Sequence, residues 1–321
     1  MSSTTELVRS LTIYVGIPIF TIGTVGNLLN VRCLWRTRRN PCAFIFICLS
    51  LINCLVLFYG LFTRILGVGF NLDWATSNLI WCKCRAAFSQ AVFFMSLTCV
   101  CLASIDRYFA SCREEKYRRL SRLSYAICAV LLTCVFWVLH SIPDLIYGTI
   151  ARNAVTGVMT CTSSAPKYFT NYQIYVSLPM YLGVFPALIL IASGLLTYRN
   201  TRQLQAERQR GVIQKQLTKM MLMQIPIILV STVPYIVFTE YSIFSATTAK
   251  STAQRATESI ISNSITLMFY LSFAASFFVF FVSSNSFRHE AKLFILCRKR
   301  GSDGNTQVQP FSTVALKNTI V

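Results

Sequence analysis

Charged residues are scarce in this chain of 321 residues, and acidic residues and histidines are the scarcest of them. Only 13% of the residues are charged, with 30 Lys and Arg against 11 Asp and Glu and 2 His. A soluble globular protein carries about 25% charged residues. The deficit, with a hydrophobic content of 54%, indicates an integral membrane protein. The net charge of +19 then reflects basic loops on the cytoplasmic side rather than a nucleic-acid partner.

The sequence also lacks the motifs of metal sites and of catalysis. His140 and His289 are too far apart for a metal or catalytic pair, and Cys82 and Cys84 are too close together for a zinc knuckle. It contains no phosphate-binding glycine loop, zinc-binding helix motif or nucleophile elbow. We therefore expect no enzyme activity and no cofactor. No Asn-x-Ser/Thr sequon occurs, so we expect no N-glycosylation.

Seven stretches are apolar and long enough to cross a membrane, which requires roughly 20 residues each. They cover residues 11–34, 42–66, 79–108, 123–147, 172–198, 220–244 and 260–283. These predict an all-α membrane protein, a seven-transmembrane helix bundle over residues 11–283. A polar N-terminus, 1–10, precedes the bundle. A short amphipathic membrane-surface helix, 284–297, and a disordered tail, 298–321, follow it.

The distribution of basic residues predicts the orientation of the bundle. One set of connections, 32–39, 107–122, 199–219 and 288–300, holds 21 Lys and Arg, whereas the N-terminus and the other three connections hold 5. Basic residues accumulate on the cytoplasmic side of membrane proteins. We expect a multi-pass protein of the plasma membrane with its N-terminus outside the cell and its C-terminus in the cytoplasm.

The tripeptide Asp106-Arg107-Tyr108 ends the third apolar stretch, at its predicted cytoplasmic side. Charged residues at this depth are costly, so an adjacent opposite pair indicates a function. At the outer side, Cys82, Cys84 and Cys161 lie in an oxidising compartment, which favours a disulfide. We expect Cys161 to pair with Cys82, which lies 25 residues before Arg107, although Cys84 competes with it.

In order and spacing, residues 10 to 297 resemble a rhodopsin-like (class A) G-protein-coupled receptor, as a divergent member. The landmarks that carry the resemblance are Gly26-Asn27, Cys82, Asp106-Arg107-Tyr108, Cys161, Pro186, Pro234 and Phe287-Arg288. The resemblance implies a receptor that binds an extracellular ligand and activates a heterotrimeric G protein. It implies that Asp106, Arg107 and Tyr108 form the G-protein switch and that Pro186 and Pro234 are pivots.

Several family motifs are altered in this chain. Asn53 replaces the Asp of the second helix, Ser231-Thr232-Val233-Pro234 replaces Cys-Trp-x-Pro, and Ser276-Phe277-Phe278-Val279-Phe280 replaces Asn-Pro-x-x-Tyr. We expect a hydrogen-bonded polar core of Asn27, Asn53, Ser96, Ser272 and Ser276 that holds sodium poorly. Without proline, the seventh helix should be straighter. Gln214 stands where an acidic partner for Arg107 is usual, which predicts raised basal activity.

The resemblance also implies a ligand pocket between the outer halves of the helices. Its positions fall on Ser89, Gln90, Phe93, Tyr235, Thr239, Thr266 and Tyr270. No acid lies near Ser89 and the seventh helix has no Lys, which argues against an amine and excludes a retinal Schiff base. Arg64, Asp144 and Glu240 near the rim favour a peptide, as in neuropeptide receptors. For each aromatic side chain of the predicted pocket, simple helix packing is an equally good interpretation.

Further partners and alternatives complete the predictions. Cys297 is either a palmitoylation site or a free thiol, and the tail carries Ser and Thr residues suited to receptor kinases and arrestin.

The alternative functions are a seven-helix transporter or channel and a chemosensory receptor for small molecules. A transporter or channel needs charged groups along a path through the membrane, and the predicted midplane offers Asn27, Asn53 and Ser96 but no carboxylate.

Overall fold

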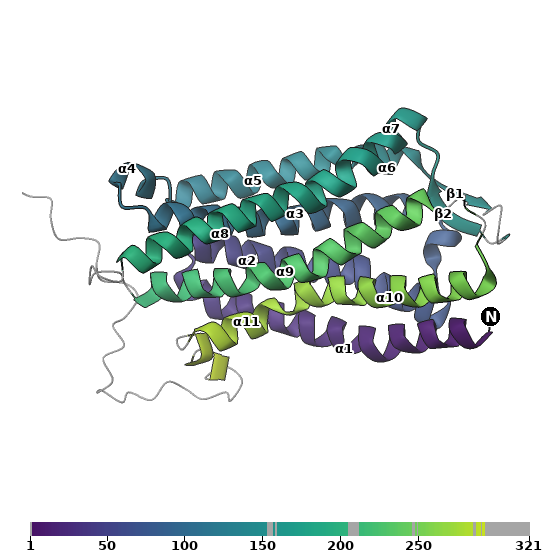
Figure 1. Ribbon diagram of the computed structural model, residues 1–321, viewed down its shortest axis with the longest axis horizontal. Helices are drawn as coiled ribbons and strands as arrows, with labels where there is room; N and C mark the ends of the chain where they lie inside the picture. Colours follow the sequence, from purple (N-terminus) through teal and green to yellow (C-terminus); the bar gives the residue numbers. More distant parts are fainter. Residues whose placement is uncertain are drawn as a thin grey trace, which may run out of the picture.

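The computed structural model describes residues 2–152, 157, 159–204, 212–245, 248, 250–284, 287–289 and 291–292. Long helices run side by side along the longest axis of the molecule (Figure 1). Six helices are long and apolar enough to cross a membrane, and a seventh span results if one bent pair is counted together. The predicted seven-helix membrane bundle is therefore confirmed.

Five spans consist of more than one helical segment. The helices are α1 (Ser2–Leu34), α2 (Pro41–Val56), α3 (Leu79–Ser111), α4 (Glu115–Arg118), α5 (Leu123–His140), α6 (Ile142–Tyr147), α7 (Lys167–Tyr172), α8 (Phe185–Leu204), α9 (Val212–Phe244), α10 (Thr252–Ala274) and α11 (Ser276–Ser283). π-Helical stretches at Leu57–Phe62 and Ile65–Gly69 continue α2, and another at Gln173–Val184 joins α7 to α8. Short 3-10 turns lie at Trp35–Thr37 and Trp74–Thr76.

Four spans begin earlier than the sequence predicted, the fifth at Lys167 rather than near 172 and the sixth at Val212 rather than near 220. The first helix starts at Ser2 rather than near residue 11, and Arg9 Nε donates a hydrogen bond to the carbonyl of Gly69, 2.7 Å away. The seventh span starts at Thr252 rather than near 260, because Ser251 Oγ caps the helix by accepting from the Gln254 N–H. An apolar stretch in the sequence marks only the part of a helix that lies in lipid, so the prediction missed these polar first turns.

The seventh span is bent, which makes the prediction of a straighter helix wrong. Its two parts, α10 and α11, meet near Ala275 at an angle of 47°. Ser272 Oγ donates to the Phe269 carbonyl, and Ser276 Oγ donates across to Asn27 of α1. Serine hydroxyls that bond to their own helix commonly bend it. We attribute the bend to Ser272, whose hydroxyl bonds to its own helix where the family has a proline nearby.

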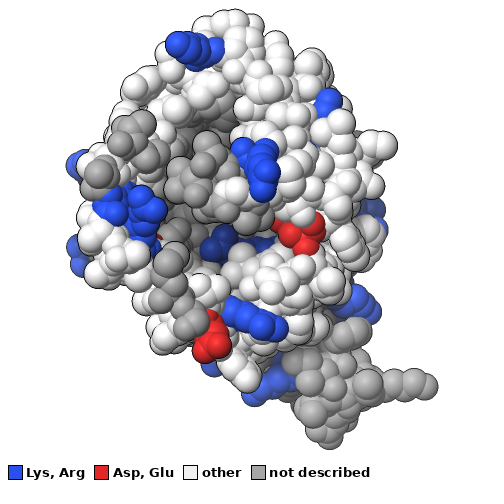
Figure 2. All heavy atoms as spheres, turned by 90° about the vertical axis from the view of Figure 1, so that its right-hand side faces the viewer, with Lys and Arg blue, Asp and Glu red and all other residues white. Residues whose placement is uncertain are grey.

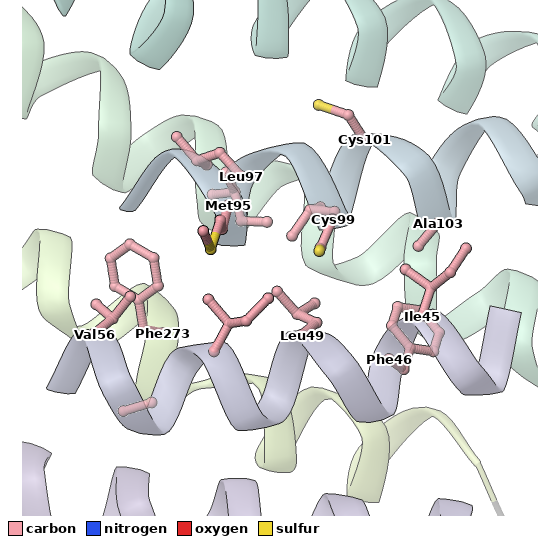
Figure 3. Packing of buried hydrophobic residues seen from close by; sticks show 14 of the residues in the cluster. Ile45, Phe46, Leu49, Val56, Met95, Leu97, Cys99, Cys101, Ala103 and Phe273 are labelled. Carbon is pink, nitrogen blue, oxygen red and sulfur yellow. The ribbon is translucent and has the colours of Figure 1, made fainter. Parts of the chain in front are cut away.

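The core of the bundle lies where α2 faces α3. Ile45, Leu49 and Val56 on α2 point toward buried side chains of α3, and Phe273 of α10 closes one side (Figure 3). Phe46 packs against Phe280 of α11. Many side chains on the outer surface of the bundle are apolar as well. Leu132 on α5, for example, is 65% exposed. An apolar exterior around a closely packed core is what a membrane requires.

One end of the bundle, here called the disulfide end, is covered by a β-hairpin. Strands β1 (Gly148–Arg152) and β2 (Met159–Ser163) pair antiparallel, with Ile150 opposite Cys161. Cys161 forms a disulfide with Cys82 at the start of α3, with a Cα–Cα distance of 5.6 Å. Cys84 is a free thiol, so Cys82 is the partner, as predicted.

The opposite end, here called the Arg107 end, carries α4 and the start of the segment after α11. Phe287, Arg288, His289, Ala291 and Lys292 have helical backbones, in agreement with the predicted amphipathic helix. Phe287 is buried against the rings of Phe277 and Phe280. Cys297 and the predicted tail, 298–321, lie outside the described residues, as does the side chain of Gln214.

Candidate functional sites

The Asp106–Arg107 pair is buried near the end of α3. Arg107 is 1% exposed, and its Nη2 and Nε lie 2.5 and 3.2 Å from Asp106 Oδ2. A buried charge is costly unless it is paired and hydrogen-bonded, and this pair meets that condition. Tyr108, the third residue of the predicted switch, is partly exposed and takes no part in these bonds. The structure therefore brings together two of the three switch residues.

Ser121 completes this site and was missed from the sequence. Its Oγ donates to Asp106 Oδ1 over 2.6 Å, so each carboxylate oxygen of Asp106 has its own partner. Ser121 lies in the basic connection between α3 and α5, just after α4. A single serine in a loop carries no pattern that would have identified it. The bond ties this loop to the end of α3.

Hydrogen bonds between helices close the Arg107 end further. Asn200 Nδ2 on α8 donates to Ser111 Oγ on α3 over 3.0 Å, and Ser284 Oγ donates to Gln216 Oε1 on α9 over the same distance. Deeper in the bundle, the hydroxyls of Ser104 and Ser193 lie 2.6 Å apart and join α3 to α8. With Arg107 almost completely buried, this is a closed arrangement of the helix ends.

An exposed ion pair lies on the surface of the same loop. Arg119 Nη2 is 2.8 Å from Glu115 Oε1, one helical turn away. The guanidinium holds the pKa of the Glu115 carboxyl below its ordinary value, chiefly through the hydrogen bond. Exposed pairs contribute little to stability, so the pair orients the loop surface without holding the fold together.

A polar core joins α1, α2, α3 and the seventh span at mid-bundle. Asn53 Oδ1 accepts from Ser96 Oγ over 2.6 Å, and Asn53 Nδ2 donates to Asn27 Oδ1 over 3.4 Å. Ser276 Oγ donates to the same Asn27 oxygen over 3.1 Å. Asn30, which was not in the predicted set, donates to Ser276 Oγ over 3.1 Å. All these side chains are buried.

The fifth predicted member, Ser272, is directed differently. Its hydroxyl donates to the Phe269 carbonyl of its own helix. Asn27 instead makes the link to α10 with its amide, which donates to the Phe273 carbonyl over 3.0 Å. The network contains amide and hydroxyl groups, and the described residues hold no cluster of three or more His, Cys, Asp or Glu that suits a metal.

The two predicted pivots occupy distinct positions in the fifth and sixth spans. Pro186 is the second residue of α8, directly after the π-helical stretch, and Pro234 lies inside α9. Proline cannot donate a backbone hydrogen bond and weakens a helix locally. Their role as pivots stays a prediction, to which the structure adds only these positions.

A cavity of about 210 Å³ lies among the third, fifth, sixth and seventh spans, toward the disulfide end. Its lining comprises Gln90, Phe93, Phe94, Gln173, Ser177, Leu178, Leu182, Tyr235 and Phe269. On the aromatic side of the cavity, Phe269 stacks on Tyr235 with ring centroids 4.2 Å apart and contacts Phe93 at 5.5 Å. Three of the predicted pocket residues, Gln90, Phe93 and Tyr235, are in this lining.

The other four predicted pocket residues lie outside the lining. The hydroxyls of Thr239 and Thr266 donate to carbonyls of their own helices, and Ser89 donates to the Tyr59 carbonyl. Tyr270 is buried, and its ring packs where a side chain at Gly60 would clash. For these residues the interpretation as helix packing or local hydrogen bonding describes the structure better.

Two polar groups in the cavity have no hydrogen-bond partner among the described residues. These are Gln90 Nε2 and Ser177 Oγ, and both atoms are buried. Buried polar groups are almost always hydrogen-bonded in native proteins. A ligand group that accepts from the Gln90 amide would satisfy the first of them. Ser177 was missed from the sequence, because it lies in the π-helical stretch, where the register of the helix is shifted.

Charged groups lie around the cavity toward the disulfide end. Arg64 Nη2 donates to Asn263 Oδ1 over 3.0 Å, while its buried Nε has no partner in the described part of the chain. Asp144 Oδ1 accepts from Gln173 Nε2 over 2.9 Å. One oxygen each of Asp144 and Glu240 is buried without a described partner. Figure 2 shows this end of the molecule hollowed, with basic side chains both around and inside the hollow.

Comparison with known proteins assigns most of the chain to one family. Residues 26–278 match the family described as 7 transmembrane receptor (rhodopsin family). Neuromedin-U receptor 2 of Mus musculus is 24% identical over 284 residues, which cover 84% of this chain and 71% of that receptor. G-protein coupled receptor 183 of Rattus norvegicus is 26% identical over 64% of this chain and 58% of its own length. Melatonin receptor type 1A of Phodopus sungorus is 27% identical over 53% and 49%.

Proposed function

The chain belongs to the rhodopsin family of 7 transmembrane receptors and is a G-protein-coupled receptor, and we propose that it recognises a peptide at its disulfide end. We further propose that this end is extracellular and that the Arg107 end meets the G protein in the cytoplasm. The excess of basic residues in the connections at the Arg107 end supports this orientation.

The unpaired amide of Gln90 is the observation that carries the ligand proposal. The cavity beside it, about 210 Å³, is smaller than the 300–1,000 Å³ or so that is usual for a whole small ligand. It suits one apolar or aromatic side chain, while the rest of the ligand lies outside it. The unpaired Nε of Arg64 and the unpaired oxygens of Asp144 and Glu240 offer partners for peptide termini and main-chain groups.

The Asp106–Arg107 pair supplies the switch. A ligand shifts the receptor toward the active state only by binding that state more tightly. In the proposed active state, α8 and α9 move apart from α3 at the Arg107 end, pivoting at Pro186 and Pro234. Arg107 leaves Asp106 and lines the opening, which accepts a helix of the G protein. Because coupling is reciprocal, bound G protein raises agonist affinity.

A peptide screen in cells that report G-protein activation tests the ligand class. Once an agonist is found, Gln90→Leu should weaken its potency about 5- to 150-fold, since an unmade buried hydrogen bond costs about 1–3 kcal/mol. Thr266→Val is the matched control, because its hydroxyl donates to the Ser262 carbonyl of its own helix and neither residue lines the cavity. Equal losses in both variants, or agonists confined to small molecules, would contradict the peptide pocket proposed here.

Arg107→Ala tests the switch separately from the pocket. Signalling should be abolished or strongly altered while surface expression persists, because the side chain is needed to line the opened site. Arg113→Ala removes an exposed charge from the same basic loop and serves as the control. Antibody access to terminal tags in intact and permeabilised cells checks the orientation. Normal coupling by Arg107→Ala would refute the mechanism.

A further inference from the structure

A second cavity lies apart from the ligand site. A groove of about 690 Å³ lies between α8 and α9, on their halves toward the Arg107 end. It is called here the α8–α9 groove, and its lining comprises Leu190, Ile191, Gly194, Leu195, Tyr198, Thr201, Lys215, Thr218, Lys219, Leu222, Met223 and Ile225. None of these residues lines the ligand cavity.

Gly194 positions the two helices beside this groove. A Cβ atom at this position would lie 2.8 Å from Ile225 Cδ1, closer than real side chains approach. The glycine therefore permits α8 to touch α9 here, and both residues of the contact belong to the groove lining. The groove is thus built by packing between the helices and by the small size of one residue.

The chemistry of the groove changes along its length. Leu190, Ile191 and Leu195 face Leu222, Met223 and Ile225, whereas Tyr198, Thr201 and the two lysines lie toward the helix ends. At 1.5 Å per residue, the eleven steps from Leu190 to Thr201 span about 16 Å. One leaflet is half of a hydrocarbon core of about 30 Å. The groove therefore matches the depth of one leaflet, with its polar part at the surface.

Lys215 and Lys219 are four residues apart on α9, so they lie on the same face, one turn from each other. Both are exposed, and neither forms an ion pair with any residue that the structure describes. Two free ammonium groups beside an apolar channel favour a ligand with an anionic head and a hydrocarbon tail. The cytoplasmic leaflet carries such lipids.

We propose that the α8–α9 groove binds an anionic phospholipid of the cytoplasmic leaflet. One acyl chain lies against the leucine-rich part of the groove, and the phosphate binds Lys215 and Lys219. The leaflet assigned here rests on the orientation given under the proposed function.

The test measures lipid retention, which does not require coupling to a G protein. The full chain is placed in bilayer discs of phosphatidylcholine with graded phosphatidylglycerol, and bound lipid is counted by native mass spectrometry. The double variant K215Q/K219Q should retain phosphatidylglycerol about 25-fold less well, since each basic residue near the membrane contributes roughly fivefold. Leu195→Trp, which places a ring in the groove, should also reduce retention.

A matched control separates a site from general attraction by charge. K116Q/R118Q removes two exposed basic residues from the loop that contains α4, away from the groove. This control should retain phosphatidylglycerol as the unaltered receptor does. The proposal is overturned if the control loses as much lipid as K215Q/K219Q, if Leu195→Trp retains it fully, or if phosphatidylcholine is retained equally. If the unaltered receptor and the variants retain lipid as expected but no peptide activates the unaltered receptor, that result counts against the proposed function alone.

Discussion

Replacing Ser121 by alanine should raise the ligand-free activity of the receptor. The hydroxyl donates to the buried Asp106 carboxylate over 2.6 Å, and a hydrogen bond to a charged group contributes about 1.5–3 kcal/mol. Ser121 is partly exposed, so the lower value applies. Arg107 leaves Asp106 in the proposed active state, and we expect the loop to release Asp106 as well, so that the bond belongs to the resting state.

The magnitude follows from the equilibrium between the two states. A loss of about 1.4 kcal/mol changes an equilibrium constant tenfold. A receptor that is about 1% active without ligand would become roughly 10% active, within the range of minor-state populations in two-state proteins. The raised basal activity that the sequence predicts from Gln214 stays a prediction, and the same assay tests it.

G-protein dissociation in ligand-free cells, normalised to surface expression, provides the assay. Ser121→Thr keeps a hydroxyl and should stay near the basal level, and Ser124→Ala removes an exposed hydroxyl nearby as a matched control. Combining Ser121→Ala with Asp106→Asn should give less than the sum of the two effects, because they break one shared contact. Unchanged basal activity in Ser121→Ala, beside a raised level in Asp106→Asn, would refute this reasoning.

Two further predictions concern the fold. Cys161→Ser should reduce the surface level and thermal stability of the receptor, since loss of a native disulfide typically costs about 2–5 kcal/mol, whereas Cys84→Ser should leave both unchanged in the same melting and labelling assays. Asn27→Ala removes the centre of the polar core and leaves its buried partners without their hydrogen bonds. It should therefore lower the melting temperature of the receptor in detergent clearly more than Ser272→Ala, whose hydroxyl bonds only to its own helix. Equal shifts in melting temperature would contradict the proposed network.

The architecture and several landmarks follow from the sequence by itself. A run of about twenty apolar residues crosses a membrane whatever surrounds it, so the seven spans could be counted without a structure. The position of Asp106 and Arg107 at the end of the third span, and the preference for Cys82 over Cys84, followed from linear spacing. These features depend on distance along one helix, which the chain fixes locally.

Contacts between helices were decided only by the tertiary structure. Ser276, directly after the bend at Ala275, bonds to Asn27, which is almost 250 residues away. Ser177 faces the cavity because a π-helical stretch shifts the register of the fifth span. Ser121 meets Asp106 because a loop folds back onto α3. A polar side chain in a membrane bundle bonds to whichever group packing brings within 3 Å or so, and no periodicity in the sequence encodes that choice.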